Sequence, residues 1–194
     1  MSGRLIRVLL VFLACGLAAS LRADGTNLLP APGGPQPGQN PATAWVLSTW
    51  NADNDPAAKG KVDGKLAIDT DGKNILTIAS TESLKTLQMW WQVQGITCAG
   101  GSSYQFSVAV KGALKSGAAR PTIGVYFIDP SGKWLGLQEV SDTTLTTLPG
   151  DWQKVNGKVT APENAATMGV RAGLIYSDGD AQVAYKDPTL TLAN

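Results

Sequence analysis

The sequence predicts an all-β protein, a sandwich or barrel of about ten short strands. Runs rich in β-branched and aromatic residues recur along the chain, with apolar and polar side chains alternating, and turn residues separate them. No window of a dozen residues has strong helical periodicity, and there is no convincing internal repeat. Short strands at this even spacing are typical of sandwiches and barrels, in which each strand buries one face.

The expected strands follow one another with short connections. In chain order they cover residues 45–50, 65–69, 74–79, 87–97, 104–111, 122–129, 134–140, 152–160, 167–176 and 182–192. The expected turns contain the glycine, proline and aspartate that tight turns favour, at Asp63-Gly64, Asp71-Gly72, Gly100-Gly101, Asp129-Pro130-Ser131-Gly132, Pro149-Gly150 and Asp178-Gly179.

The first residues have the features of an export signal. Arg4 and Arg7 precede an apolar run over residues 8–19, so residues 1–23 are expected to be a secretory signal peptide. In an alternative reading, Cys15 is acylated and tethers the protein to a membrane. Residues 24–43 are expected to form an extended, proline- and glycine-rich arm with a first short strand, and residues 44–194 the β-sandwich domain. The expected location is secreted, periplasmic or at the cell surface.

Composition argues against several classes of function. Without residues 1–23 the chain has 13 basic and 15 acidic residues, a formal charge of −2, so neither nucleic acid nor an anionic membrane surface is an expected partner. Histidine is absent, which excludes Ser-His and Cys-His catalysis and histidine-bearing zinc sites. Cys98 would be the one remaining cysteine and is expected to be a buried thiol, with an intermolecular disulfide as the alternative.

The strand at residues 87–97 has the most informative pattern. Alternation sends an apolar set towards the core and a mixed set to the outer face: Leu87, Met89, Trp91 and Val93 inward, and Gln88, Trp90 and Gln92 outward. A tryptophan beside two amides suits a sugar, because the C–H face of a pyranose packs on the indole while its hydroxyl groups need hydrogen-bond partners. The alternative is that Trp90 is half-buried beneath a loop.

Three later strands place further candidates on an outer face. Tyr126 alternates with the apolar residues of strand 122–129, and Arg171 stands between two glycines in strand 167–176. In strand 134–140, the side chains of Leu135 and Leu137 are expected inside, and those of Trp134 and Gln138 outside. The alternatives are that Trp134 packs over its own hairpin and that Arg171 forms an ordinary surface ion pair. The sequence leaves open whether Trp90, Tyr126 and Trp134 share one face.

Several segments in a fixed order resemble a known family. They are Asn27-Leu28-Leu29, Gln92-Val93 leading into Gly101-Ser102-Ser103-Tyr104 and residues 105–111, Trp152-Gln153-Lys154-Val155 with Ala161-Pro162, and Ala184-Tyr185-Lys186-Asp187-Pro188-Thr189-Leu190. The series resembles the jelly-roll carbohydrate-binding modules of secreted glycoside hydrolases, of the CenC-like type, over nearly the whole chain after residue 23. The resemblance implies a single jelly-roll (galactose-binding-like) β-sandwich of two antiparallel sheets. It also implies glycan binding through Gln88, Trp90 and Gln92, with Tyr126, Trp134 and Arg171 as further candidates.

Such modules hold a structural calcium ion, and here the match is incomplete. The family's glutamate has no counterpart near Pro32-Gly33-Gly34-Pro35, so only Asp187 remains as a ligand, and one carboxylate makes a weak calcium site. Asp53 with Asp55, and Asp69 with Asp71, echo the start of a calcium loop but are expected to bond backbone amides in turns. No cofactor is expected apart from a weak calcium ion at Asp187.

The expected function is that of a secreted, non-catalytic protein that stacks a neutral polysaccharide or oligosaccharide on exposed aromatic rings and bonds it through amides. Separate glycan-degrading enzymes would be its partners. One alternative is an envelope or matrix domain for protein contacts or adhesion. The other is a jelly-roll polysaccharide lyase or hydrolase with Tyr126 or an acid as catalyst, although nothing in the sequence places two carboxyl groups about 5–9.5 Å apart across a cleft.

Overall fold

The computed structural model describes residues 25–30, 32, 44–51, 62–80, 87–116, 118–140, 148–178 and 180–193. Within these ranges the chain forms ten strands, and no helix there is long and apolar enough to cross a bilayer. The expected signal peptide, Cys15, most of the expected arm, Asp53 and Asp55 lie outside the described residues.

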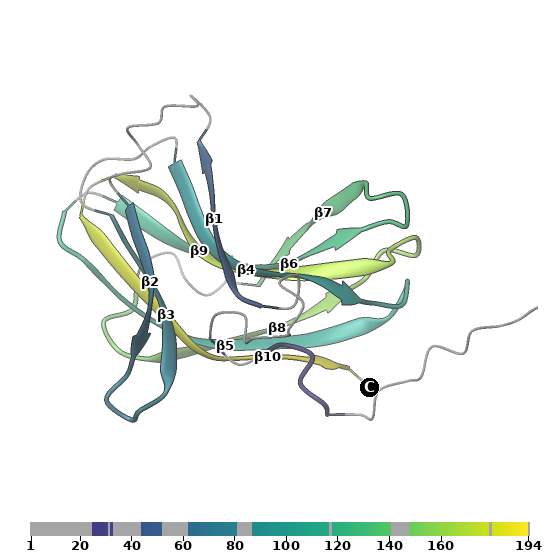
Figure 1. Ribbon diagram of the computed structural model, residues 1–194, viewed down its shortest axis with the longest axis horizontal. Coiled ribbons are helices and arrows are strands. Elements are labelled where there is room, and N and C mark those ends of the chain that lie inside the picture. Colours follow the sequence, from purple (N-terminus) through teal and green to yellow (C-terminus); the bar gives the residue numbers. More distant parts are fainter. Residues whose placement is uncertain are drawn as a thin grey trace, which may run out of the picture.

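The strands form two five-stranded antiparallel sheets packed as a sandwich (Figure 1). The first sheet has the order β1 (Val46–Asn51), β4 (Leu87–Thr97), β9 (Thr167–Asp178), β6 (Ala118–Ile128) and β7 (Trp134–Glu139). The second has the order β2 (Val62–Ile68), β3 (Asn74–Ser80), β10 (Ala181–Leu192), β5 (Ser103–Leu114) and β8 (Gln153–Thr160). The predicted jelly-roll sandwich of two antiparallel sheets is confirmed.

The core lies between the sheets and is built from the predicted inward faces. Met89, Trp91 and Val93 of β4 are buried against residues of the opposite sheet such as Phe106 and Tyr185. Two hydrogen bonds join the sheets across the core. The Trp91 indole N–H donates to the Thr77 carbonyl, at 3.0 Å, and the Tyr185 hydroxyl donates to the Gly173 carbonyl. Because buried polar groups are costly when unpaired, these bonds fix how the sheets lie against each other.

Cys98 is buried, as predicted, and burial raises the pKa of its thiol.

Two face or turn assignments are wrong. Asp63-Gly64, expected to form a turn, lies within β2, because these residues pair in register with Ala79 and Ile78 of β3. The turn predicted at Asp71-Gly72 is confirmed: Gly72 has a φ of 79° and its N–H donates to the Asp69 carbonyl.

Strand β7 also departs from the prediction. Leu135 packs against the core and Trp134 is exposed, as expected, but an irregularity at Gly136, with a φ of 125°, shifts the alternation by one residue. Leu137 therefore lies beside Tyr126 on the outer face. The amide of Gln138 turns towards the second sheet, where it donates to the Thr160 carbonyl at 2.7 Å and accepts from the Thr160 N–H at 3.0 Å.

The described part of the N-terminal arm docks along β10. The Leu28 N–H donates to the Leu190 carbonyl, and the Asn27 side chain accepts from the Leu29 and Leu190 N–H groups and donates to the Pro188 carbonyl. Leu29 is buried at the edge of the core.

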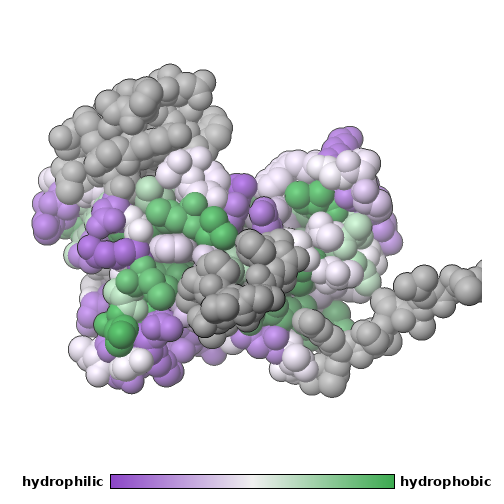
Figure 2. All heavy atoms as spheres, in the orientation of Figure 1, coloured by the Kyte–Doolittle hydropathy of each residue, from purple (hydrophilic) through white to green (hydrophobic). Residues whose placement is uncertain are grey.

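The first sheet curves so that its outer face is concave. In Figure 1 the ends of β1 and β4 rise on one side and β7 rises on the other, above the layer formed by β5, β8 and β10. In the same orientation, the space-filling view dips between these two parts, and the coloured residues around the dip include strongly hydrophilic as well as apolar ones (Figure 2). The candidate residues of the sequence lie on this face.

Candidate functional site

Strand pairing brings the predicted residues of β4 beside Arg171 on the outer face of the first sheet. Trp90 lies opposite Gly173 of β9, and Gln92 lies opposite Arg171. Gln88 shares the face, since it is two residues from Trp90, and its side chain is half-buried. The neighbour of Trp90 on β1 is Ser48. The tryptophan and the two amides thus face outward, as predicted.

Tyr126 and Trp134 reach the same place from the other side of β9. Arg171 lies opposite Gly124 of β6, and Gly169 lies opposite Tyr126. Trp134 begins β7, and its indole stacks on the Tyr126 ring with centroids 4.9 Å apart and planes 19° from parallel. The question that the sequence left open is answered: the three aromatic residues share one face.

Arg171 lies among these rings. Its guanidinium carbon is 4.3 Å from the ring centroid of Trp90 on one side, and 4.9 Å and 5.0 Å from those of Tyr126 and Trp134 on the other. All three distances are within the range of cation–π attraction. We call these four residues the Arg171 stack.

Trp90 is less accessible than an open platform would be. Its side chain points outward, yet only 7% of the residue is exposed. Its indole N–H donates to Gln92 Oε1 at 3.1 Å, and the Gln92 amide in turn donates to Ser48 Oγ at 2.8 Å. Trp90 and Gln92 therefore bond to each other and form one wall against Arg171.

Trp134 is the accessible ring of the Arg171 stack, with 44% of the residue exposed. One of its faces rests on Tyr126, which is 3% exposed. Supported from below in this way, the indole offers surface to a ligand without needing a large rearrangement. Tryptophan surfaces of this kind contribute strongly to binding in known complexes.

Two glycines of β9 lie against the aromatic residues, and one of β6 lies against β7. A Cβ atom on Gly169 would lie 2.3 Å from Cζ and Oη of Tyr126, and one on Gly124 would lie 3.0 Å from Leu137 Cδ1. A Cβ on Gly173 would lie 2.5 Å from Trp90 Cβ. The glycines that flank Arg171 in the sequence thus allow the aromatic side chains to lie flat across β9.

Among the described residues, the charge of Arg171 has no counter-ion. Its Nε is buried without a hydrogen-bond partner, and no ion pair joins the guanidinium to any residue within the described ranges. Burial lowers the pKa of Arg171 somewhat, and the group remains a cation because an arginine starts from so high a value. Burial also raises the pKa of the Tyr126 phenol, with an opposing effect from the Arg171 charge. The ion pair considered as the alternative for Arg171 does not occur among the described residues.

One acid does lie on this face, and sequence reasoning missed it. Glu139 of β7 is opposite Gly124, but its carboxylate accepts hydrogen bonds from Arg120 Nη1 at 3.0 Å and Thr122 Oγ1 at 3.2 Å. Strict alternation through β7 predicts that Glu139 faces the core. The irregularity at Gly136 changes which residues face outward, so Glu139 lies on the outer face. Ser48 was also missed, although its alternation with Leu47, which packs on the core, would have revealed it.

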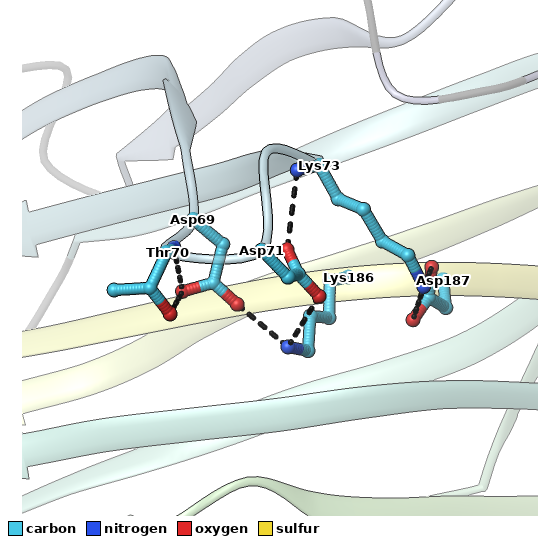
Figure 3. Close-up of polar contacts among 6 residues, drawn as sticks. All are labelled: Asp69, Thr70, Asp71, Lys73, Lys186 and Asp187. Carbon is cyan, nitrogen blue, oxygen red and sulfur yellow. Dashed lines mark hydrogen bonds and ion pairs between the residues drawn. The ribbon is translucent and has the colours of Figure 1, made fainter.

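The residues around Asp187 do not fit a calcium site. Its carboxylate pairs with Lys73 Nζ at 3.1 and 3.2 Å, so an ammonium group stands where a cation would bind (Figure 3). In the neighbouring turn, Asp69 pairs with Lys186 Nζ at 2.6 Å and accepts from the Thr70 N–H, in line with the expected turn chemistry. Nowhere in the described ranges do three or more acidic, cysteine or histidine side chains gather as metal ligands. We derive no role for calcium.

Comparisons by sequence find no relative: no protein-family description matches the chain, and no curated protein matches it. Comparisons by structure find similar folds. The CBM22-1 xylan-binding domain of Paenibacillus barcinonensis Xyn10C has a TM-score of 0.55 and 16% identity, with 87% of this chain and 96% of that chain covered. The CBM22-1–GH10 modules of Clostridium thermocellum xylanase 10B, solved with xylohexaose, have a TM-score of 0.52 and 15% identity over 76% of this chain and 26% of that one.

A third similar structure is the enzymatically active domain of tailspike protein 4 of bacteriophage CBA120. It has a TM-score of 0.58 and 13% identity, with 86% of this chain and 21% of that chain covered. The chain therefore spans about a fifth of the tailspike and a quarter of the two-module xylanase, but nearly all of the isolated xylan-binding domain. At these identities the likeness shows the fold, and that fold is the jelly-roll sandwich of carbohydrate-binding modules, as the sequence resemblance implied.

Proposed function

We propose that this protein is an exported, non-catalytic glycan-binding module, and that its ligand lies on the concave outer face of the first sheet. The observation that carries the proposal is the accessible Trp134 indole, stacked on Tyr126 next to a guanidinium without a counter-ion. The fold supports it, because the similar structures include an isolated domain named for binding xylan and a module pair solved with xylohexaose.

In this proposal the residues of the face have different roles. The exposed face of Trp134 packs against the C–H face of a sugar ring, and Arg171 supplies hydrogen-bond donors beside it. Trp90 and Gln92, which bond to each other, hold Arg171 in place and do not themselves form the platform. Gln88 lies at the β1 side of the same face and can bond the hydroxyl groups of a neighbouring sugar unit.

Two features favour binding over catalysis. Tyr126, which the sequence offered as a catalyst, is covered by its neighbours, and its raised pKa makes its phenol a poor base near neutral pH. Glu139, the acid on this face, is already held by Arg120 and Thr122. A glycoside-cleaving pair needs a second carboxyl group across the ligand, and the described residues place none beside Glu139.

The test is Trp134→Ala, measured by affinity electrophoresis of the purified protein through gels that contain a panel of soluble xylans, β-glucans and polyuronates. At least one polysaccharide should retard the wild-type protein, and the variant should bind about tenfold or more weakly, since tryptophans are common binding hot spots. Its melting temperature should fall by only a few degrees, because almost half of Trp134 is exposed and loss of the ring pair with Tyr126 costs about 0.5–1.5 kcal/mol.

Ile68→Ala is the matched control. Ile68 is the most exposed large apolar residue of the described chain, at 71%, and lies on β2 of the other sheet. Its replacement should leave retention unchanged. Retention of Trp134→Ala equal to that of the wild-type protein would exclude this face, and a wild-type protein that no polysaccharide retards would overturn the proposed function.

A further inference from the structure

The most unusual group in the molecule is the guanidinium of Arg171. Several other described cations pair with carboxylates, as Lys73, Lys115 and Lys186 do. Arg171 has aromatic neighbours instead, and its Nε is buried with no partner. Deepening the proposed function, on which this step rests, we infer that the glycan carries a carboxylate group, as uronic acids do, and that Arg171 binds it.

The geometry leaves the guanidinium ready for such a group. Rings from β4 on one side and from β6 and β7 on the other occupy the space beside the guanidinium carbon, at 4.3 to 5.0 Å. Arg171 as a whole is half-buried, its Nε is buried without a partner, and no hydrogen bond joins the guanidinium to another residue within the described ranges. A planar fork of donors matches the two oxygens of a carboxylate.

The electrostatics of the face favour an anion over a neutral sugar. Three charged residues lie there among the described residues: Arg120, Glu139 and Arg171. Arg120 and Glu139 neutralise each other at 3.0 Å, so the charge of Arg171 is left over. Cation–π attraction to the rings offsets part of the desolvation of this charge, but it leaves the N–H groups without acceptors. A ligand carboxylate would supply both the negative charge and the acceptors.

The surroundings of Arg171 would also strengthen its pair with a ligand carboxylate. Trp90 and Tyr126, both buried, flank the half-buried guanidinium and reduce its contact with water, and a charge-assisted pair is stronger where that contact is reduced. The rings hold the arginine in one conformation before the ligand arrives, so little side-chain entropy is lost on binding.

The experiment uses matched pairs of polysaccharides with the purified protein. Glucuronoxylan, polygalacturonate and alginate are each compared with their carboxyl-reduced forms, in which the uronate carboxylate has become a primary alcohol and the backbone is otherwise the same. Binding is measured by affinity electrophoresis and calorimetry at fixed ionic strength. At least one acidic polymer should bind about tenfold to a hundredfold more tightly than its reduced form, the range typical of a hydrogen-bonded charged group.

Two variants assign the preference to Arg171. Arg171→Gln should bind the acidic and reduced forms equally, and Arg171→Lys, which keeps the charge but not the planar fork, should fall in between. Lys154→Gln is the control, because it removes one exposed positive charge from β8 of the other sheet and should keep the full preference. Thermal melts check that each variant is folded, and the wild-type comparison needs no variant.

The outcomes separate the two proposals. Equal binding of the acidic and reduced polymers by the wild-type protein, or tighter binding of the reduced ones, overturns the carboxylate inference and leaves glycan binding intact. A preference that persists in Arg171→Gln or disappears in Lys154→Gln also overturns it, since general charge attraction would then be the cause. Binding to no polymer of either form overturns the proposed function, and the inference with it.

Discussion

Gly169→Ala provides a strict test of the Arg171 stack, because a single methyl group should displace it. The added Cβ would lie 2.3 Å from Cζ and Oη of Tyr126 and 2.6 Å from Cε1. Carbon atoms in contact are normally about 3.5–4.0 Å apart, so the ring must move by more than about 1 Å. Gly169 has no positive φ, so the backbone itself tolerates alanine and the whole effect comes from the ring.

The ring has little freedom to move, which sets the magnitude. Tyr126 is 3% exposed and lies between Trp134, at 4.9 Å, and the guanidinium of Arg171, also at 4.9 Å. Overpacking a filled site costs about 1–3 kcal/mol. Loss of the ring pair adds about 0.5–1.5 kcal/mol. We therefore expect Gly169→Ala to lower the free energy of unfolding by about 2–4 kcal/mol, and to weaken glycan retention in the folded fraction.

Urea unfolding measures the free energy, and two further variants isolate its cause. Gly150→Ala is the control, since a Cβ there meets nothing within 4 Å, and it should change stability little. In a Tyr126→Leu background the ring is gone, so the additional effect of Gly169→Ala should shrink to less than about 1 kcal/mol. An equal cost of Gly169→Ala in both backgrounds, or a cost no larger than that of Gly150→Ala, would refute the placement of the ring.

Two further predictions concern the ion pairs around β10 and the expected metal. The hydrogen bond from Lys186 lowers the pKa of Asp69 below its ordinary 3.8, so the contribution of this carboxylate to stability is present above that pH and is lost as the pH falls through the folded pKa. The stability gap between the wild-type protein and Asp69→Asn should therefore shrink in acid, in urea titrations at stepped pH. Asp63→Asn, in the exposed pair with Lys65, should have little effect at any pH, and an Asp69→Asn gap that stays constant down to about pH 2 would contradict the assignment. Because Lys73 pairs with the Asp187 carboxylate, EDTA should leave the melting temperature unchanged. A decrease in melting temperature that added calcium reverses would show that the protein binds calcium after all.

The faces of the strands could be predicted because alternation is a local property. Trp91 and its apolar neighbours are inside and Trp90 outside, since consecutive side chains of a strand must point to opposite faces. The outer face was predicted correctly for Arg171, which stands between two glycines, for the same reason. The prediction failed in β7, where one irregular residue, Gly136, reverses the alternation that follows it and exchanges Leu137 with Gln138.

The accessibility of Trp90 could not be predicted, because it depends on strands distant in the sequence. Its cover includes Arg171, which is 81 positions along the chain and becomes its neighbour only through the pairing of β4 with β9. The same pairing underlies the carboxylate inference, which departs from the neutral ligand expected from the charge balance. A net charge of −2 favours a neutral partner on average, whereas one guanidinium whose nearest acid is already engaged can select an anion locally.

The residues of the Arg171 stack have different roles in the proposed binding mode, and these roles give a reason for the low exposure of Trp90. An arginine has about 2 kcal/mol of rotamer entropy, and a flexible one would lose much of it when it binds a ligand. Trp90 and Tyr126 remove that freedom during folding, from opposite sides, while the glycines of β9 let both rings approach the arginine closely. In the proposed binding mode, two aromatic residues that barely reach the surface thus contribute to affinity through Arg171, and direct contact with the sugar falls to Trp134 at the edge of the sheet. In this binding mode the outward tryptophan of β4 lies on the proposed binding face, where it would position the charge of Arg171.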